Sequence, residues 1–224
     1  ASLQIQTDDQ GNTDSGGAQN DDDTISISVE ALNDAPIHTV PEEQSISEDQ
    51  ILTFSSGNGN LIHIADVEAD AEDSSVEVTL TSTNGTVNLS GTNELTFSSG
   101  DGSADASMVF TGTLTHINNA LDGLTFEPTP DFDGAASLQI QTDDQGNSDS
   151  NGAQNDDDTI SISVEALNDA PIHTVPQEQT INEDQTLTFE EGNENLIHIT
   201  DVEAEAEDSS VEVTLTSTNG TASL

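Results

Sequence analysis

The thirteen residues TISISVEALNDAP occur twice in the chain, at 24–36 and at 159–171. In each copy apolar side chains alternate with Ser and Thr, which is typical of a β-strand with one buried face. Asn-Asp-Ala-Pro follows the strand, and a proline there cannot continue a central strand and stiffens the connection. We therefore interpret the stretch as the last strand of one domain followed by the junction to the next.

The duplication extends over the whole chain with a period of 135 residues. Aligning residue n with residue n + 135 pairs 89 positions (224 − 135), and 76 of them are identical. A period of this length corresponds to a whole domain rather than to a solenoid unit. With the boundary after the Asn-Asp pair, residues 1–34 are the C-terminal strands of a preceding repeat, 35–169 are a complete repeat, and 170–224 are the N-terminal strands of a following repeat. We expect the chain to belong to a longer tandem array.

Apolar residues with a period of two predict short strands through the complete repeat. The predicted strands are 52–54, 76–82, 94–97, 107–112, 124–128, 138–142 and 159–165. Asn84-Gly85 lies between two apolar runs and predicts a hairpin turn. A helix is predicted over 115–123, because Ile117 and Leu121 are spaced i, i+4 and Gly123 can form the C-terminal cap. The pattern predicts an all-β fold of tandem Greek-key β-sandwiches, with one short helix per repeat.

All the formal charge of the side chains has one sign. The chain has 45 Asp and Glu residues and no Lys or Arg, and it also lacks Cys. Nucleic acid and anionic membranes are therefore excluded as expected partners, because no side chain could neutralise phosphates. No apolar run approaches the ~18 residues of a membrane span, and no signal peptide is visible. Cations are the expected counter-species, although adaptation to salt also produces acidic surfaces.

The acidic residues gather in loops and at strand ends. They fall at 47–50, 66–75, 142–147 and 155–158, where they precede or follow predicted strands. Carboxylates crowded at one end of a sandwich raise one another's pKa unless a cation neutralises them. Calcium binds six to eight oxygen ligands from carboxylates, amides and carbonyls. The positions therefore predict Ca²⁺ sites at the ends of the sandwich.

The order of these features resembles cadherin-like domains, in particular the tandem repeats of giant bacterial surface adhesins of the RTX type, which are exported by type I secretion. In cadherins a linker D-x-N-D-N-x-P precedes a domain, a Glu follows about a dozen residues later, and a D-x-D loop comes further on. The stretches NGTVNL (84–89) and LTFEPTPDFDGAASLQIQTDDQGN (124–147) also resemble bacterial cadherin-like repeats. The resemblance implies an immunoglobulin-like sandwich, an extracellular location and calcium at each junction.

The loop positions and the resemblance together name the candidate metal ligands. In the complete repeat they are Asn33, Asp34, Glu48, Asp49, Asp66, Glu68, Asp70, Asp143 and Asp144, and in the second copy Asn168, Asp169, Glu183, Asp184, Asp201 and Glu203. The chain departs from the cadherin pattern in two ways. The first acidic position of the linker is Ala31 or Ala166, and the second Asp of the D-x-D loop is Glu. Fewer calcium ions per junction than in animal cadherins are therefore expected.

The expected function is structural. We expect a calcium-stiffened repeat of an adhesin stalk or filament on a bacterial cell surface, which acts as a spacer or fibre shaft and contacts neighbouring repeats or lateral copies. The five His residues include no pair with zinc-ligand spacing, and no nucleophile–base arrangement emerges, so no enzyme is expected. A ligand-binding adhesive module that recognises a glycan or a partner protein is the alternative, although Trp and Tyr are absent. A self-assembling filament subunit is a further alternative.

Overall fold

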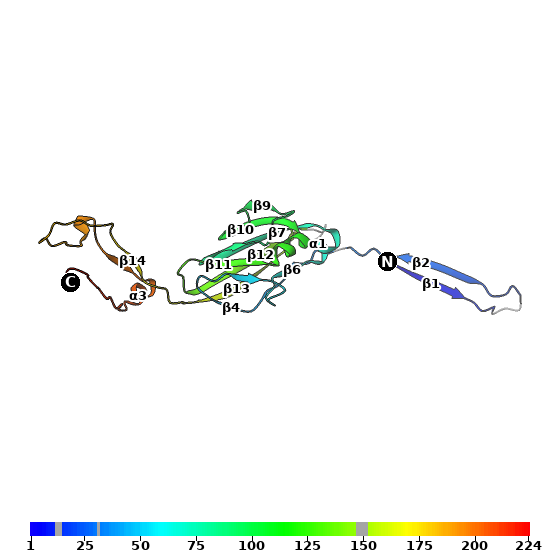
Figure 1. Cartoon of the computed structure of the whole chain (residues 1–224). Coiled ribbons are helices and arrows are strands. Elements are labelled where there is room, and N and C mark those ends of the chain that lie inside the picture. The colour runs from blue at the N-terminus through cyan, green and yellow to red at the C-terminus, as the bar shows by residue number, and fades with distance from the viewer. Residues whose placement is uncertain (12–14, 31, 147–151) are drawn as a thin grey trace.

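The computed structural model describes residues 1–11, 15–30, 32–146 and 152–224. A packed body lies between two thinner ends (Figure 1). We call residues 35–169 the central repeat, 1–34 the N-terminal segment and 170–224 the C-terminal segment. Strands dominate the N-terminal segment and the central repeat, so the predicted all-β class is confirmed. The body is sandwich-like, and the Greek-key order of its connections stays a prediction.

Two sheets form the body of the central repeat. The larger sheet has the strand order β4-β13-β12-β7-β10-β9, and the smaller has the order β5-β11-β8. A short β3-β6 pair adds to them. Their bounds are β3 Ile37–Thr39, β4 Gln44–Ser47, β5 Leu52–Phe54, β6 His63–Ala65, β7 Ser75–Thr83, β8 Gly85–Asn88, β9 Thr96–Ser99, β10 Ser107–Thr113, β11 Leu124–Pro128, β12 Gly134–Asp143 and β13 Asn155–Glu165.

The alternating sequence produces an alternating burial pattern. In β7 the side chains of Val76, Val78 and Leu80 are fully buried while their neighbours are partly exposed. The inner faces of β12 and β13 have the same pattern. Phe54, Phe110 and Phe126 are the largest buried side chains and come from three different strands. Removal of this apolar surface from water is the main favourable contribution to folding.

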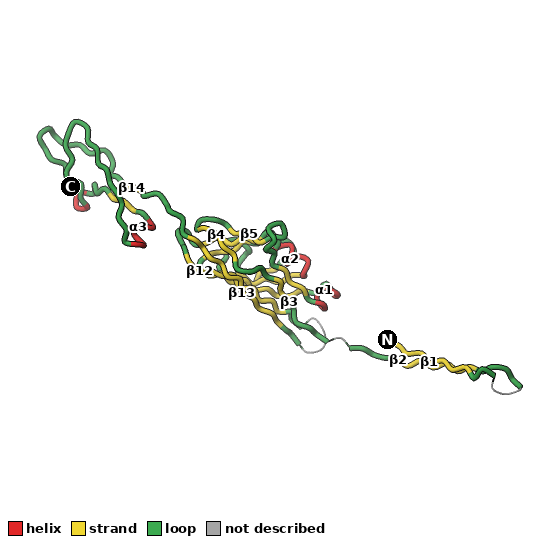
Figure 2. The backbone as a smooth tube through the Cα atoms, turned by 90° about the horizontal axis from the view of Figure 1, so that it is seen from below, coloured by secondary structure: helices red, strands yellow, loops and turns green. Residues whose placement is uncertain are grey.

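Two short helices flank the sheets of the central repeat. The predicted helix is α2 (Leu114–Leu121), and Ile117 and Leu121 are both fully buried in the core. The second is α1 (Val67–Glu72), which occupies the acidic loop where no helix is predicted. Asp66 begins α1 by accepting a hydrogen bond from the Ala69 N–H, which is the contact that an N-cap makes. Both views place α1 at the end of the body that faces the N-terminal segment (Figures 1 and 2).

The predicted hairpin at Asn84-Gly85 is wrong. β7 belongs to the larger sheet and β8 to the smaller, so the chain crosses between the two sheets at this point. Asn84 has a left-handed φ of 55°, which also suits a hairpin turn. The local sequence therefore looks the same for a crossing between sheets as for a hairpin. A Cβ at Gly85 would lie 2.5 Å from the Phe126 ring of β11. Packing against β11 therefore takes the place of pairing with β7.

The two end segments repeat parts of this structure. β1 (Ser2–Asp8) and β2 (Asn20–Ser26) pair in the register of β12 and β13, since Ser2 faces Ser26 as Ser137 faces Ser161. The C-terminal segment contains β14 (Ile172–Thr174), a 3₁₀ turn (Glu191–Asn193), β15 (His198–Thr200) and α3 (Val202–Glu207). In the described part of the chain, no helix has the length and apolar composition needed to cross a bilayer.

Candidate metal centre

Asn33 anchors the linker to the end of the central repeat. Its side chain is buried, and its Nδ2 donates to Asp144 Oδ2 at 2.6 Å and to the Gly152 carbonyl at 2.9 Å. The Gln154 side-chain amide donates to the Asn33 carbonyl at 2.6 Å. These contacts fix the orientation of the Asn33 amide. Its Oδ1 is consequently a buried acceptor without a hydrogen-bond partner.

Asp144 holds the loop after β12 together. Its carboxylate is fully buried, and Oδ1 accepts from the Gly146 and Gln154 N–H groups, each at 2.8 Å. With Asn33 Nδ2, three N–H donors therefore point at this one carboxylate. The repeat-related Asp9 accepts from Gly11 at 2.9 Å and from Gln19 at 2.7 Å. These two hydrogen bonds lower the pKa of Asp9 below its ordinary value, and the bond from Gln19 has the larger effect.

Asp66 contributes a second buried oxygen without a partner. Its Oδ1 accepts from the Ala69 N–H at 2.7 Å, whereas its Oδ2 has no hydrogen-bond partner. Burial raises the pKa of Asp66, and the nearby carboxylates of Asp144 and Glu68 raise it further. Both effects disfavour the ionised form. A cation beside Oδ2 would oppose both effects.

Glu68 and Asp34 complete this end of the repeat, which we call the N-terminal seam (Asn33, Asp34, Asp66, Glu68, Asp70 and Asp144). The Asp34 N–H donates to Glu68 Oε2 at 3.3 Å. Asp34, Asp66 and Asp70 line one recess with Pro36. The available ligands are carboxylate and amide oxygens, the set that Ca²⁺ prefers. Two of these oxygens are buried without partners, so the donor atoms present are of the kind that calcium takes.

A second acidic group lies between the central repeat and the C-terminal segment, and we call it the C-terminal seam (Asp49, Asp131, Asp169, Asp201 and Glu203). Asp49, Asp131 and Asp169 each offer one carboxylate oxygen, and these oxygens lie within 4.8 Å of one another. Loss of hydration is the largest effect that raises the pKa of Asp169. The neighbouring carboxylates raise it further, in the order Glu203, Asp49, Asp131 and Asp201. The Asp169 N–H donates to Glu203 Oε2 at 3.2 Å, the same contact that Asp34 makes with Glu68.

The structure divides the predicted ligands between the two seams. Asn33, Asp66 and Asp144 meet at one end of the central repeat, whereas Asp49 lies at the other end with Asp169. Each repeat therefore offers ligands at both ends. The sequence does not identify Asp131 as a ligand, because Asp131-x-Asp133-Gly134 is typical of a turn after a strand. Only the tertiary fold brings Asp131 close to Asp49 and Asp169.

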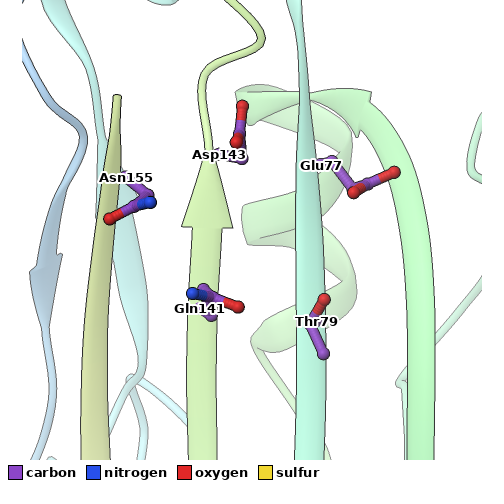
Figure 3. A pocket seen from close by; sticks show the side chains of 5 residues that line it. All are labelled: Glu77, Thr79, Gln141, Asp143 and Asn155. Atoms are coloured by element: carbon purple, nitrogen blue, oxygen red, sulfur yellow. The ribbon is translucent and has the colours of Figure 1, made fainter. Parts of the chain in front are cut away.

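Glu48 and Asp143 each accept a hydrogen bond from a residue outside the two seams. Glu48 is buried, and its carboxylate accepts a hydrogen bond from the Leu167 N–H, which ties β4 to the linker after β13. Asp143 lines a polar recess with Glu77, Thr79, Gln141 and Asn155 (Figure 3). Its Oδ1 accepts from the Gln145 N–H at 2.7 Å, a contact that stabilises the turn. These two residues therefore have structural contacts of their own.

The remaining predicted ligands lie in the linker after β13 and in the C-terminal segment. Glu183 and Asp184 are exposed. Asn168 is also exposed and donates to the Asp169 carbonyl at 2.9 Å, unlike its buried counterpart Asn33. Ala166 is exposed, and Ala31 lies outside the described residues. Comparisons with protein-family models, curated proteins and solved structures found no match for this chain.

Proposed function

We propose that this chain is a calcium-stiffened structural repeat of an extracellular bacterial adhesin stalk or filament. In this role it is a cadherin-like spacer or fibre shaft without catalytic activity. The observation that carries the proposal is the pair of buried oxygens at the N-terminal seam, Asn33 Oδ1 and Asp66 Oδ2, which have no hydrogen-bond partners. The chain has no Lys or Arg that could donate a hydrogen bond to either oxygen or neutralise the Asp66 carboxylate. A divalent cation from the medium is the simplest partner.

The repetition of the seams supports a spacer. The linker N–H of Asp34 bonds to Glu68 at 3.3 Å, and that of Asp169 bonds to Glu203 at 3.2 Å. Both Glu residues belong to short helices with an Asp N-cap. A tandem array whose joints share one geometry has a regular length and direction. Regular length is the property that a stalk requires.

The mechanism is thermodynamic linkage. A cation that binds the folded seam and not the unfolded chain stabilises the folded seam by RT ln(1 + [L]/Kd), ~2.7 kcal/mol at a hundredfold excess over Kd. Without the cation, the carboxylates of the seam repel one another. Calcium should therefore both raise the melting temperature and straighten the joint.

The test is a melting and small-angle scattering experiment on the 224-residue chain in calcium and in EDTA. We expect calcium to raise the Tm and to increase the maximum dimension. Asp66→Asn should reduce the calcium-dependent rise in Tm, because it removes one negative charge from the seam. It should still form the N-cap, since Asn accepts from the Ala69 N–H as Asp does.

Glu43→Gln is the matched control. It also removes one negative charge, but Glu43 is exposed and belongs to neither seam. Its response to calcium should equal that of the parent chain. An unchanged Tm together with an unchanged maximum dimension in calcium would refute the proposal. So would an equal loss of the calcium response in both variants, because it would indicate general screening of charge.

A further inference from the structure

We propose that His38, Asp156 and Asp158 form a binding site for a divalent transition-metal ion of the zinc class. Each offers one ligand atom, and the three atoms lie within 4.8 Å of one another. Its three ligand residues are not among the residues of the two seams. It does not depend on the proposed function.

The two carboxylates lie on the inner face of β13. Burial alternates along this strand, and Ile160 and Ile162 are buried on its inner face. Asp156 and Asp158 continue the same alternation toward the start of the strand, and their side chains are 34% and 40% exposed. An alternating strand places residues of one parity on one face. Two acidic residues therefore occupy positions that apolar residues fill further along.

His38 of β3 faces these carboxylates from a buried position. Its side chain is 0% exposed, and its Nε2 lies 2.8 Å from Thr142 Oγ1 of β12. Its main-chain N–H donates to Asp156 Oδ2 at 2.9 Å, which fixes that oxygen. His38 Nδ1 is buried and has no hydrogen-bond partner. When Nε2 donates to Thr142, Nδ1 presents a lone pair toward two negative groups.

The distances suit a metal ion. His38 Nδ1 lies 3.4 Å from Asp158 Oδ2 and 3.6 Å from Asp156 Oδ2. Zinc binds nitrogen and carboxylate oxygen at ~2.0–2.1 Å in a tetrahedron, which separates neighbouring ligand atoms by ~3.3–3.4 Å. An imidazole whose other ring nitrogen is held by a hydrogen bond is also typical of metal-binding histidine. Calcium is a poorer match because it prefers ligands that are all oxygen, whereas imidazole suits zinc, copper and nickel.

A proton on Nδ1 is the competing occupant. A doubly protonated His38 would form ion pairs with both carboxylates. Charge-assisted N–H···O bonds are usually ~2.7–2.9 Å long, shorter than the two distances here. The distances therefore leave room for a metal ion, and the titration and NMR experiment distinguishes a metal ion from a proton on Nδ1.

The repeat provides internal controls. His173 is the counterpart of His38 and is exposed in the C-terminal segment. Asp21 and Asp23 are the counterparts of Asp156 and Asp158 and are exposed in the N-terminal segment. Among the described residues, neither end segment brings such a His together with such a pair of carboxylates. The 224-residue chain should therefore hold one site of this kind.

The experiment is a calorimetric titration of the EDTA-treated, dialysed chain with Zn²⁺ in a millimolar Ca²⁺ buffer, which occupies the oxygen sites. We expect one equivalent of zinc to bind. His38→Gln and Asp158→Asn should each weaken binding by about tenfold or more, whereas His173→Gln should leave it unchanged. Nitrogen NMR of the histidine rings should show that zinc shifts His38 Nδ1 and leaves Nε2 protonated. Circular dichroism confirms that each variant folds.

Three results would overturn the site. One is the absence of saturable zinc binding in calcium, with NMR showing that a proton occupies His38 Nδ1. Another is binding that Asp158→Asn and His38→Gln leave at the parent affinity. The third is a zinc-induced shift at another histidine in place of His38. If His38→Gln does not fold, Asp158→Asn and the NMR assignment still decide the question.

Discussion

The β1–β2 hairpin and the β12–β13 hairpin have nearly the same sequence and the same register but opposite environments. Leu3 and Ile5 are 56% and 58% exposed, whereas their counterparts Leu138 and Ile140 are fully buried. The β1–β2 ladder therefore forms without a core. The two hairpins differ in their neighbouring strands. β12 also pairs with β7, and β13 also pairs with β4. Local sequence specifies the hairpin, and distant strands specify its burial.

The counterpart of β7 shows the opposite behaviour. VEVTLTS at 211–217 is identical to 76–82, yet it forms no strand and Val211, Val213 and Leu215 are about half exposed. In the described part of the chain, β7 pairs with β10 and β12, which are distant in sequence. A hairpin closes a short loop, whereas distant pairing has a larger entropic cost and requires its partners. Identical residues thus adopt a strand in one repeat and an irregular conformation in the other.

Removal of a buried side chain should separate the two hairpins most strongly. Ile140→Ala leaves a cavity in the core and should lower the free energy of unfolding by about 2–5 kcal/mol. Ile5→Ala removes the same atoms from an exposed position and should change the free energy of unfolding by about 0.5 kcal/mol or less. Urea unfolding followed by far-UV circular dichroism measures both, because the chain has no Trp or Tyr for fluorescence. Equal losses would contradict the view that burial distinguishes the hairpins.

A smaller effect is expected where the chain crosses between the sheets. Gly85→Ala places a methyl group 2.5 Å from the Phe126 ring and 2.6 Å from the Glu127 carbonyl. Such overpacking should destabilise the central repeat by about 1–3 kcal/mol. Gly220→Ala, the repeat-related substitution, meets nothing within 4 Å and should be close to neutral. Calorimetric melting of both variants is the measurement, and a neutral Gly85→Ala would show that Phe126 moves away freely.

The smallest expected effect is the pH dependence that Asp66 contributes in EDTA. Its pKa is raised in the folded state, so the folded chain binds this proton more readily than the unfolded chain. The contribution of Asp66 to stability is therefore greatest below its ordinary pKa and is lost as the pH rises through the raised value. Asp66→Asn should remove this pH-dependent loss of stability. The difference in the free energy of unfolding between Asp66→Asn and the parent should therefore change as the pH rises from the ordinary pKa of Asp66 through its raised pKa.

Asp201→Asn is the control for this pH experiment. It removes one charge from the repeat-related N-cap, at the C-terminal seam beside Asp169. Unfolding of the central repeat is followed against pH in both variants. If Asp201→Asn reproduces the pH dependence of Asp66→Asn, general charge repulsion would explain the result in place of the burial of Asp66.

The sequence predicts what depends on local pattern and misses what depends on tertiary contact. The β-strands of the core and the helix around Ile117 and Leu121 follow from periodicity. The hairpin at Asn84 fails because a left-handed turn residue serves a sheet-to-sheet crossing equally well. α1 is missed because its acidic sequence has no apolar face long enough to reveal a helix. It forms because Asp66 caps its first turn and Ala69 packs into the core.

The candidate sites follow the same division. Asn33, Asp66 and Asp144 are predicted from their loop positions and the resemblance to cadherins, and they meet in the structure at one end of the central repeat. Asp131, His38, Asp156 and Asp158 are not identified as ligands. Their partners lie on strands or loops that only the fold brings together. A single sequence shows which residues can bind a cation, but it does not show which of them share one.

The parallel pairing of β4 with β13 has a mechanical consequence. Gln44–Ser47, near the start of the central repeat, run beside Ile162–Glu165 at its end and in the same direction. Tension on the two ends of the repeat therefore pulls these strands past each other along their length, so their hydrogen bonds resist together in shear instead of opening one by one. Beyond Glu165, the Glu48 carboxylate bonds to the Leu167 N–H and lengthens this clamp by one further contact.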